Sequence, residues 1–236
     1  MPCETAAVSQ QPADHPFTPD LFERFDETDD ALFYAFPRRV VHLDDGALAA
    51  VRRFFAEALP HDASLLDLMA SWRSHYPEEI APRRAVGLGL NAEEMSENPD
   101  LDAHVVHDLN RDPRIPFADA EFDAATLTVS MQYLVHPIEV FRDVRRVLRP
   151  GGRFVVVLSQ RCFPPKAVKI WQQCANMRER MELGMAYFRY AGGFEDLLGV
   201  DLRPNPPPDG DPVVAVFASR AGRAEREPPS SGWRRR

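Results

Sequence analysis

The stretch from Asp108 to Leu158 constrains the fold of this chain more than any other part of the sequence. It contains an apolar strand pattern at Phe122–Leu127, an amphipathic helical pattern at Pro137–Leu148 and a second apolar strand pattern at Arg153–Leu158. Two glycines, Gly151 and Gly152, are placed to end the helix. A strand, a helix and a strand joined by short loops predict half of a doubly wound α/β sheet.

Other apolar segments extend this alternation in both directions. Strands are expected at Leu65–Leu68 and Ala85–Leu88, with a weaker one near His104–His107. Leu197–Leu202 and Val213–Ala218 are predicted as two further strands joined by a Pro-rich turn. Strands that alternate with helical patterns indicate a mostly parallel sheet with helices on both faces.

Two more helical regions frame these strands. Asp44 or Asp45 is suited to cap a helix whose apolar positions share one face, and Pro60 is expected to end it. A long helical region rich in Met and aromatic residues is predicted over Lys166–Tyr190. One domain over residues 17–220 accounts for all these elements, with residues 1–16 and 221–236 predicted as disordered ends.

Composition excludes several classes of function. The net charge of −8 argues against nucleic acid as the main partner. No apolar run reaches the roughly 18 residues of a membrane span, and the polar N-terminus lacks the order of a signal peptide, so a cytoplasmic protein without a membrane segment is expected. Cys3, Cys162 and Cys174 cannot form a disulfide framework. Ordinary thiols are favoured over a metal or substrate role, and no oligomeric state is indicated.

Two motifs connect the chain to a known family. The turn after the predicted helix is Arg-Val-Leu-Arg-Pro-Gly-Gly at 146–152, and the strand before it is preceded by Pro-Phe-Ala-Asp-Ala-Glu-Phe-Asp at 116–123. Over roughly residues 22–220 the sequence resembles the class I S-adenosylmethionine-dependent methyltransferases that act on small molecules, in their type 11 branch. The resemblance implies a Rossmann-like doubly wound sheet, mostly parallel, with an antiparallel C-terminal edge hairpin. It also implies S-adenosylmethionine as the cofactor.

The resemblance assigns cofactor roles to individual residues. Asp67 matches the family acid at the end of the first strand. Asp108 and Leu109 match a pair in which the carboxylate accepts a hydrogen bond from the adenine amino group and the next residue packs on the ring. Ser130, with Thr128 and Val129, follows the fourth strand and is expected to line the methyl donor.

The loop after Asp67 departs from the family pattern, because it lacks the expected glycines. Met69, Ala70 and Ser71 stand in their place, followed by Trp72. Ala70 and Ser71 are small enough for the cofactor to approach and are expected to present N–H groups to the cleft. Because residues other than glycine rarely adopt positive φ, residues 69–71 are expected to keep negative φ.

The second departure lies at the end of the second strand. Gly89 stands where the family usually has an acid that accepts hydrogen bonds from the ribose. Asn91, two residues on, is a candidate ribose ligand. The alternative for Asn91 is to cap a helix around Ala92–Met95.

The substrate side is less well marked, because methyl transfer needs positioning more than a fixed catalytic motif. The N-terminal segment 17–60 is expected to form a lid and a helix, with Phe33, Tyr34 and Phe36 over the cleft and Arg38 or Arg39 meeting an anion. An acidic run at residues 26–30 is expected to be a solvated turn, with a metal site as the alternative. Metal sites are otherwise not predicted. The candidates for positioning the acceptor are Tyr34, Arg38, His75, Tyr133 and His136.

The sequence therefore leaves two functions open. S-adenosylmethionine-dependent methyl transfer to a small molecule is favoured by Asp67, Asp108 and the lid aromatics. A catalytically inactive methyltransferase-like binding or partner module is favoured by the missing glycines and the missing ribose acid.

Overall fold

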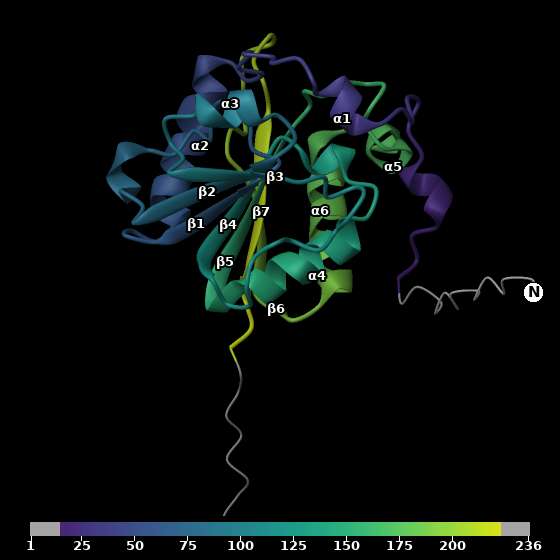
Figure 1. Ribbon diagram of the computed structural model, residues 1–236. Helices are drawn as coiled ribbons and strands as arrows, with labels where there is room; N and C mark the ends of the chain where they lie inside the picture. The colour runs from purple at the N-terminus through teal and green to yellow at the C-terminus, as the bar shows by residue number, and fades with distance from the viewer. Residues whose placement is uncertain (1–14, 223–236) are drawn as a thin grey trace, which may run out of the picture.

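A computed structural model describes residues 15–222, in which the chain forms one seven-stranded sheet (Figure 1). The predicted disordered ends fall almost entirely on residues 1–14 and 223–236, which lie outside the described part, as does Cys3. In sheet order the strands are β3 (Ala103–Val106), β2 (Arg84–Gly89), β1 (Ser64–Leu68), β4 (Phe122–Thr128), β5 (Leu148–Ser159), β7 (Val213–Arg220) and β6 (Phe194–Asp201).

The pairing of these strands confirms the predicted fold class. The first five strands in sheet order are parallel to one another. β7 pairs antiparallel with β5, and β6 pairs antiparallel with β7, so the C-terminal hairpin closes one edge as expected. The strand order reverses between β1 and β4, which places a topological switch point at their carboxyl ends.

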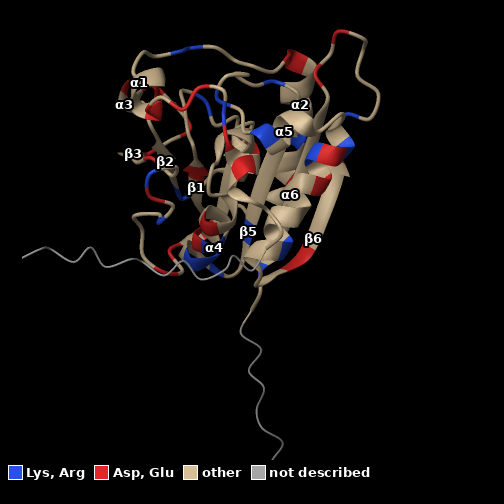
Figure 2. Ribbon diagram, turned by 90° about the vertical axis from the view of Figure 1, so that its right-hand side faces the viewer, with Lys and Arg blue, Asp and Glu red and all other residues tan. Residues whose placement is uncertain are grey.

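Helices cover both faces of the sheet, as Figure 1 shows. The α-helices are α1 (Asp30–Phe33), α2 (Asp45–Ala58), α3 (Ala92–Ser96), α4 (Pro137–Val147), α5 (Lys169–Gln173) and α6 (Met177–Ala191). Short 3-10 helices are η1 (Pro19–Phe22), η2 (Glu78–Ile80) and η3 (Met131–Tyr133). Charged residues lie mainly on helices, loops and strand ends, whereas the middle of the sheet carries few (Figure 2). Among the described residues, no helix is long and apolar enough to cross a membrane.

Two apolar cores hold the layers together. On one face, Ala47, Val51 and Phe55 of α2 pack with Leu65 and Val155 of the sheet. The Asp44 side chain caps α2 by accepting from the Ala47 N–H at 3.0 Å, as expected. The other face is covered by α4 and α6. Both cores pack against the sheet and so fix the positions of the strand ends, where the functional site lies.

Two predicted boundaries were wrong. α4 ends at Val147, several residues before the glycines, because Leu148 already pairs with Phe122 and begins β5. The two glycines lie inside a register shift of β5, where Gly151 has φ 76°. The region Lys166–Tyr190 is also not one helix: Asn176 caps α6 by accepting from the Glu179 N–H at 3.0 Å, and this separates α6 from α5.

Candidate functional site

The carboxyl ends of the parallel strands open into one cavity of about 170 Å³. Its floor is formed by the end of β1 with the loop 69–73, by the end of β2 and by the loop after β3. Residues 128–130 after β4 form one wall. The lid, defined here as residues 34–43, covers it and crosses above the strand ends at the top of Figure 1. Ligands of open α/β sheets bind at this place.

The cavity brings together all but one of the candidate residues. His136 is the exception, because it precedes the first turn of α4 and lies in a second hollow beside residues 15–30. His136 therefore does not line the cavity that holds the other candidates. The candidates that do line the cavity are Tyr34, Arg38, Asp67, Ala70, Ser71, His75, Asn91, Asp108, Leu109, Ser130 and Tyr133.

Asp67 lies at the bottom of the cavity in a buried polar network. Its carboxylate accepts hydrogen bonds from the Ser74 hydroxyl at 2.7 Å and from the Thr126 hydroxyl at 3.0 Å. The Tyr76 hydroxyl shares a hydrogen bond with Thr126 at 2.7 Å. Burial raises the pKa of Asp67 to about 7, and the two donated hydrogen bonds oppose this only in part. Asp67 is thus part protonated near neutral pH.

The turn after β1 overturns one prediction. Met69 has φ 53°, a left-handed conformation that glycine normally supplies, so the expectation of negative φ was wrong. The Ala70 N–H donates to the Leu88 carbonyl at 2.9 Å, so this group holds the loop against β2 instead of facing the cleft. At the end of β4, Val129 has φ 50°, which is unfavourable for a β-branched residue. Both strained residues line the cavity, as strained backbone at functional sites often does.

The close packing of the same loop explains why residue 89 is a glycine. A Cβ atom at Gly89 would clash with the Ala70 carbonyl oxygen, so no side chain fits there. The backbone of the loop after β1 therefore excludes an acidic side chain at the end of β2. The loop lies closely over the end of β2 and takes the space that an acidic side chain would need.

Asn91 fills the structural role that the sequence offered as an alternative. Its Oδ1 caps α3 by accepting from the Glu94 N–H at 3.0 Å. Its Nδ2 donates to the Tyr34 carbonyl at 2.9 Å, which fastens the lid to α3. Since the cap and the lid engage both ends of the amide, Asn91 primarily shapes the cavity.

Glu94 is a cavity residue that the sequence analysis missed. It is 8% exposed, accepts from the Ser71 hydroxyl at 2.5 Å and also accepts from the Arg38 N–H. It thus joins the β1 loop, α3 and the lid. The Asn-x-x-Glu spacing at 91–94 gave a signal, but one typical of a helix cap rather than a site.

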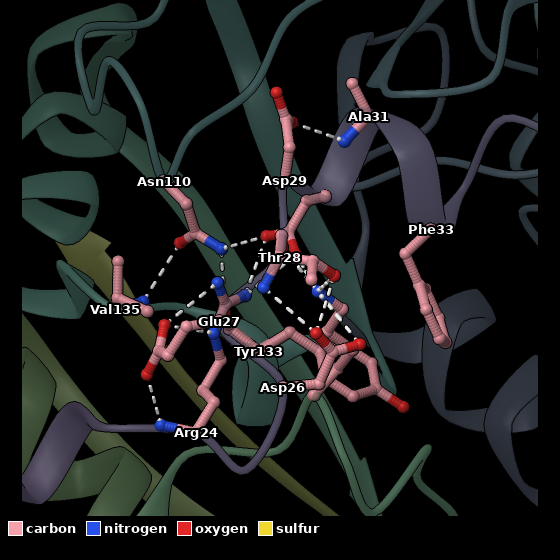
Figure 3. Close-up of polar contacts among 12 residues, drawn as sticks. Arg24, Asp26, Glu27, Thr28, Asp29, Ala31, Phe33, Asn110, Tyr133 and Val135 are labelled. Carbon is pink, nitrogen blue, oxygen red and sulfur yellow. Dashed lines mark hydrogen bonds and ion pairs between the residues drawn. The ribbon is translucent and has the colours of Figure 1, made fainter.

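A network of polar contacts, partly drawn in Figure 3, anchors the segment before the lid. Asp30 is paired with Arg24 at 2.7 Å and with Lys166 at 3.2 Å, and Lys166 is fully buried. Asn110 donates to Asp30 at 2.9 Å and to the Tyr133 carbonyl at 2.9 Å. Burial raises the pKa of Asp30, but the hydrogen bonds from Asn110 and Arg24 outweigh it and lower the pKa overall.

The expectation of a solvated acidic turn was therefore wrong for Asp30, whose carboxylate is 6% exposed. Asp29 instead caps α1 by accepting from the Ala31 N–H at 2.9 Å, and Glu27 accepts from the Arg24 N–H at 2.6 Å. In residues 15–222, no group of three or more His, Cys, Asp or Glu side chains is placed to hold a metal ion.

Comparison with known proteins gives consistent relatives. A family model described as a methyltransferase domain matches residues 80–156. The demethylmenaquinone methyltransferase of Beutenbergia cavernae is 40% identical over 68 residues, which are 29% of this chain and 27% of that protein. The chain thus matches about a quarter of the length of this curated relative.

Solved structures share the fold over more of the chain. Geranyl diphosphate C-methyltransferase from Streptomyces coelicolor A3(2), solved with Mg²⁺, geranyl diphosphate and S-adenosyl-L-homocysteine, has a TM-score of 0.52 and 16% identity, covering 80% of this chain and 94% of that one. An S-adenosylmethionine-dependent methyltransferase from Mesorhizobium loti has a TM-score of 0.51 and 16% identity, covering 72% of this chain and 98% of that one. The methyltransferase-domain match and the shared fold together support a class I methyltransferase-like family for this chain.

S-adenosylmethionine is the cofactor of this family, and one side chain in the cavity wall fits such a ligand. The Thr128 hydroxyl is buried at the end of β4 and has no hydrogen-bond partner within the described residues. Buried polar groups without partners are uncommon in folded proteins and usually mark an absent water or ligand. Thr128 therefore supplies an unused hydrogen-bonding group on a residue that lines the cavity.

The lid and the neighbouring Phe33 differ in part from what the sequence predicts. Phe33 packs on Phe163 with ring centroids 5.6 Å apart, but Phe36 is 79% exposed and does not cover the cleft. Arg39 also points away, because it pairs with Glu93 and Glu97 on the surface. Arg38 is the arginine that lines the cavity. Burial lowers the pKa of His75 to about 4, so His75 is neutral and a weak base at neutral pH.

Proposed function

We propose that this chain binds S-adenosylmethionine in the cavity and transfers its methyl group to a small molecule. The observation that carries the proposal is the convergence of Asp67, Asp108 and Leu109 on one cavity at the switch point of the sheet. These residues come from two different strand ends. The resemblance gives each of them a cofactor role.

The residues divide the cavity into two ends. Asp108 and Leu109 would hold the adenine, with the Asp108 carboxylate fixed by the Asn110 N–H at 2.9 Å. Thr128 and Ser130 would lie at the methionine end. When bound, the cofactor supplies an activated methyl group on a positively charged sulfur. The chain then contributes orientation and exclusion of water, which are the main requirements of an in-line displacement.

Entry of the cofactor requires movement of the lid or of the β1 loop. The cavity of about 170 Å³ is smaller than the roughly 300–1,000 Å³ of most small-molecule sites. The Trp72 Nε1–H donates to the Val40 carbonyl at a long 3.3 Å, so Trp72 connects the β1 loop to the lid. An outward displacement of residues 34–43 would enlarge the cavity without disturbing the sheet.

Calorimetric titration with S-adenosylmethionine and S-adenosylhomocysteine tests the proposed function directly. The wild type is expected to bind both. Met69→Gly is expected to retain binding, because glycine adopts the positive φ of this position without strain. If the wild type shows no binding at millimolar cofactor while Trp72→Ala or Met69→Gly restores it, the loop is a plug and the chain is not an enzyme.

Asp108→Ala is expected to weaken cofactor binding about tenfold to 150-fold, because a hydrogen bond to a charged group contributes about 1.5–3 kcal/mol. Calorimetry with S-adenosylhomocysteine measures the change. Asp112→Ala is the matched control, since Asp112 lies in the same loop but is exposed and accepts from the Arg114 N–H. Equal affinities of the Asp108→Ala and Asp112→Ala variants would remove Asp108 from the site.

A non-catalytic binding module is the second candidate function. The observation that favours it is the loop itself, which takes the space above Gly89 and leaves the cavity small. Binding of S-adenosylhomocysteine without methyl transfer to any acceptor would support this candidate.

A further inference from the structure

Arg38 occupies an unusual position on the lid. Its guanidinium carbon lies 4.4 Å from the centroid of the Phe33 ring and 5.5 Å from those of Tyr34 and Phe163. One terminal nitrogen, Nη2, donates to the Phe33 carbonyl at 2.6 Å. The other, Nη1, is buried and has no hydrogen-bond partner within residues 15–222.

A buried guanidinium nitrogen without an acceptor is costly. Each guanidinium N–H that loses water without gaining a partner costs free energy. The three rings compensate in part through cation–π attraction, but they supply no oxygen acceptor. The planar guanidinium matches a carboxylate or a phosphate through two parallel hydrogen bonds. Arg38 thus presents an unused donor suited to an anion.

The carboxylates that line the cavity do not neutralise Arg38. Asp67 is held by Ser74 and Thr126, and Asp108 by the Asn110 N–H. Glu94 accepts from the backbone N–H of Arg38, not from its guanidinium. In the described part of the chain, no ion pair involving Arg38 is formed with any carboxylate, so the cation lacks a counter-charge within the protein.

A flat aromatic wall lies beside Arg38, and a second, already paired cation lines the same cavity. The charge of Arg161 adds to burial in lowering the pKa of His42, but its Nε donates to the buried Asp211 carboxylate at 2.6 Å. Phe163 stacks on Tyr133 with centroids 6.1 Å apart and an interplanar angle of 27°. The Tyr133 hydroxyl accepts from the Phe163 N–H at 2.8 Å, which fixes the two rings together. This end of the cavity therefore combines positive charge with an aromatic surface.

We infer that the methyl acceptor is a small organic anion whose carboxylate or phosphate binds Arg38 while its apolar body lies against Phe163 and Tyr133. This inference rests on the proposed function, because the acceptor enters the same cavity. Arg38 is then the residue that selects anionic over neutral acceptors. Its place on the lid also means that an acceptor, once bound, holds the lid closed through the guanidinium.

The experiment uses three probes of similar shape on the full chain: benzoate, phenyl phosphate and benzamide. Each is titrated calorimetrically in the presence and absence of S-adenosylhomocysteine. At least one of the two anions is expected to bind at millimolar concentration, and more tightly than neutral benzamide. Which anion binds more tightly distinguishes a carboxylate acceptor from a phosphate acceptor. Arg38→Gln is expected to weaken anion binding about tenfold to 150-fold, the usual loss of a charged hydrogen bond, and Arg38→Lys to weaken it less.

Arg39→Gln is the matched control, since Arg39 pairs with Glu93 and Glu97 on the surface and is expected to leave anion binding unchanged. Equal binding of benzamide and the anions by the wild type overturns the inference, and this comparison requires no variant. Failure of both anions to bind also overturns it, as does an Arg38→Gln variant with unchanged anion affinity. Binding of S-adenosylhomocysteine separates the two proposals: if it binds but neither anion does, only this inference fails. If the anions bind through Arg38 but S-adenosylhomocysteine does not, the proposed function fails, and with it the role of the bound anion as methyl acceptor.

Discussion

Asp30→Asn is expected to lower the free energy of unfolding by about 3–5 kcal/mol, the usual cost of removing one partner from a buried ion pair. Asparagine keeps the shape of Asp30 but leaves the fully buried Lys166 with only partial compensation, from Asp26 at 3.4 Å and from the Thr28 carbonyl at 2.6 Å. Arg24 loses its buried partner as well. Urea denaturation at pH 7, followed by circular dichroism, measures the change.

Glu27→Gln supplies the control for this prediction. Glu27 also pairs with Arg24, but its side chain is 59% exposed, and exposed pairs contribute about 0–1 kcal/mol. The double variant Asp30→Asn with Lys166→Met is expected to lose less than the sum of the two single losses, because it removes both charges of one pair. If Asp30→Asn is no more destabilising than Glu27→Gln, burial of this network contributes nothing measurable to the anchoring of the lid.

The sheet could be predicted from the sequence because each strand carries its own signal. Phe154–Leu158 of β5 is a continuous apolar run, and Phe122–Leu127 of β4 is largely apolar, as expected for parallel strands that are buried on both faces. Leu197–Leu202 and Val213–Ala218 could be predicted as two strands from the Pro-rich turn between them, and the resemblance implied the antiparallel hairpin that they form. These signals are local, so one sequence is enough to reveal them.

The buried ion pair that holds the segment before the lid had no such local signal in the sequence. Asp30 and Lys166 are far apart in the sequence, and a run of acidic residues is usually a solvated turn. Only the tertiary fold brings η1 beside α5 and places Lys166 against α1. A buried lysine is rare without a paired acid, but the sequence does not show which lysine is buried.

The conformation of the loop after β1 could not be predicted from the sequence either. Positive φ at Met69 is unfavourable by itself and is held by tertiary contacts, in particular by the Ala70 N–H on Leu88. Gly89 indicated a departure from the family, but its cause lies in the Ala70 carbonyl, a backbone atom of another loop. Propensity rules describe isolated residues, so they fail where two loops constrain each other.

Asp67→Asn is expected to stabilise the protein above pH 7, by up to about 4 kcal/mol, and to have little effect near pH 4. A carboxyl group whose pKa rises from 3.8 to about 7 on folding is destabilising once it is ionised. Below pH 3.8 it is protonated in both states and costs nothing. Between pH 3.8 and 7 the folded state binds more protons than the unfolded state, so stability falls as the pH rises. Denaturant titrations of both proteins from pH 4 to pH 8 measure the difference.

Asp123→Asn is expected to show the opposite pH dependence of stability, at a second carboxylate of the sheet. Burial raises the pKa of Asp123, but the hydrogen bonds from Arg149 and from the Ser64 N–H outweigh it and lower the pKa overall. Its contribution to stability is therefore present at neutral pH and is lost as the pH falls through the folded-state pKa. Asp123→Asn should be destabilising at pH 7, and this loss should shrink toward acid, opposite to the behaviour of Asp67→Asn.

A constant difference between wild type and Asp67→Asn from pH 4 to pH 8 would show that the pKa of Asp67 is not raised, and that the floor of the cavity is more hydrated than its buried contacts imply.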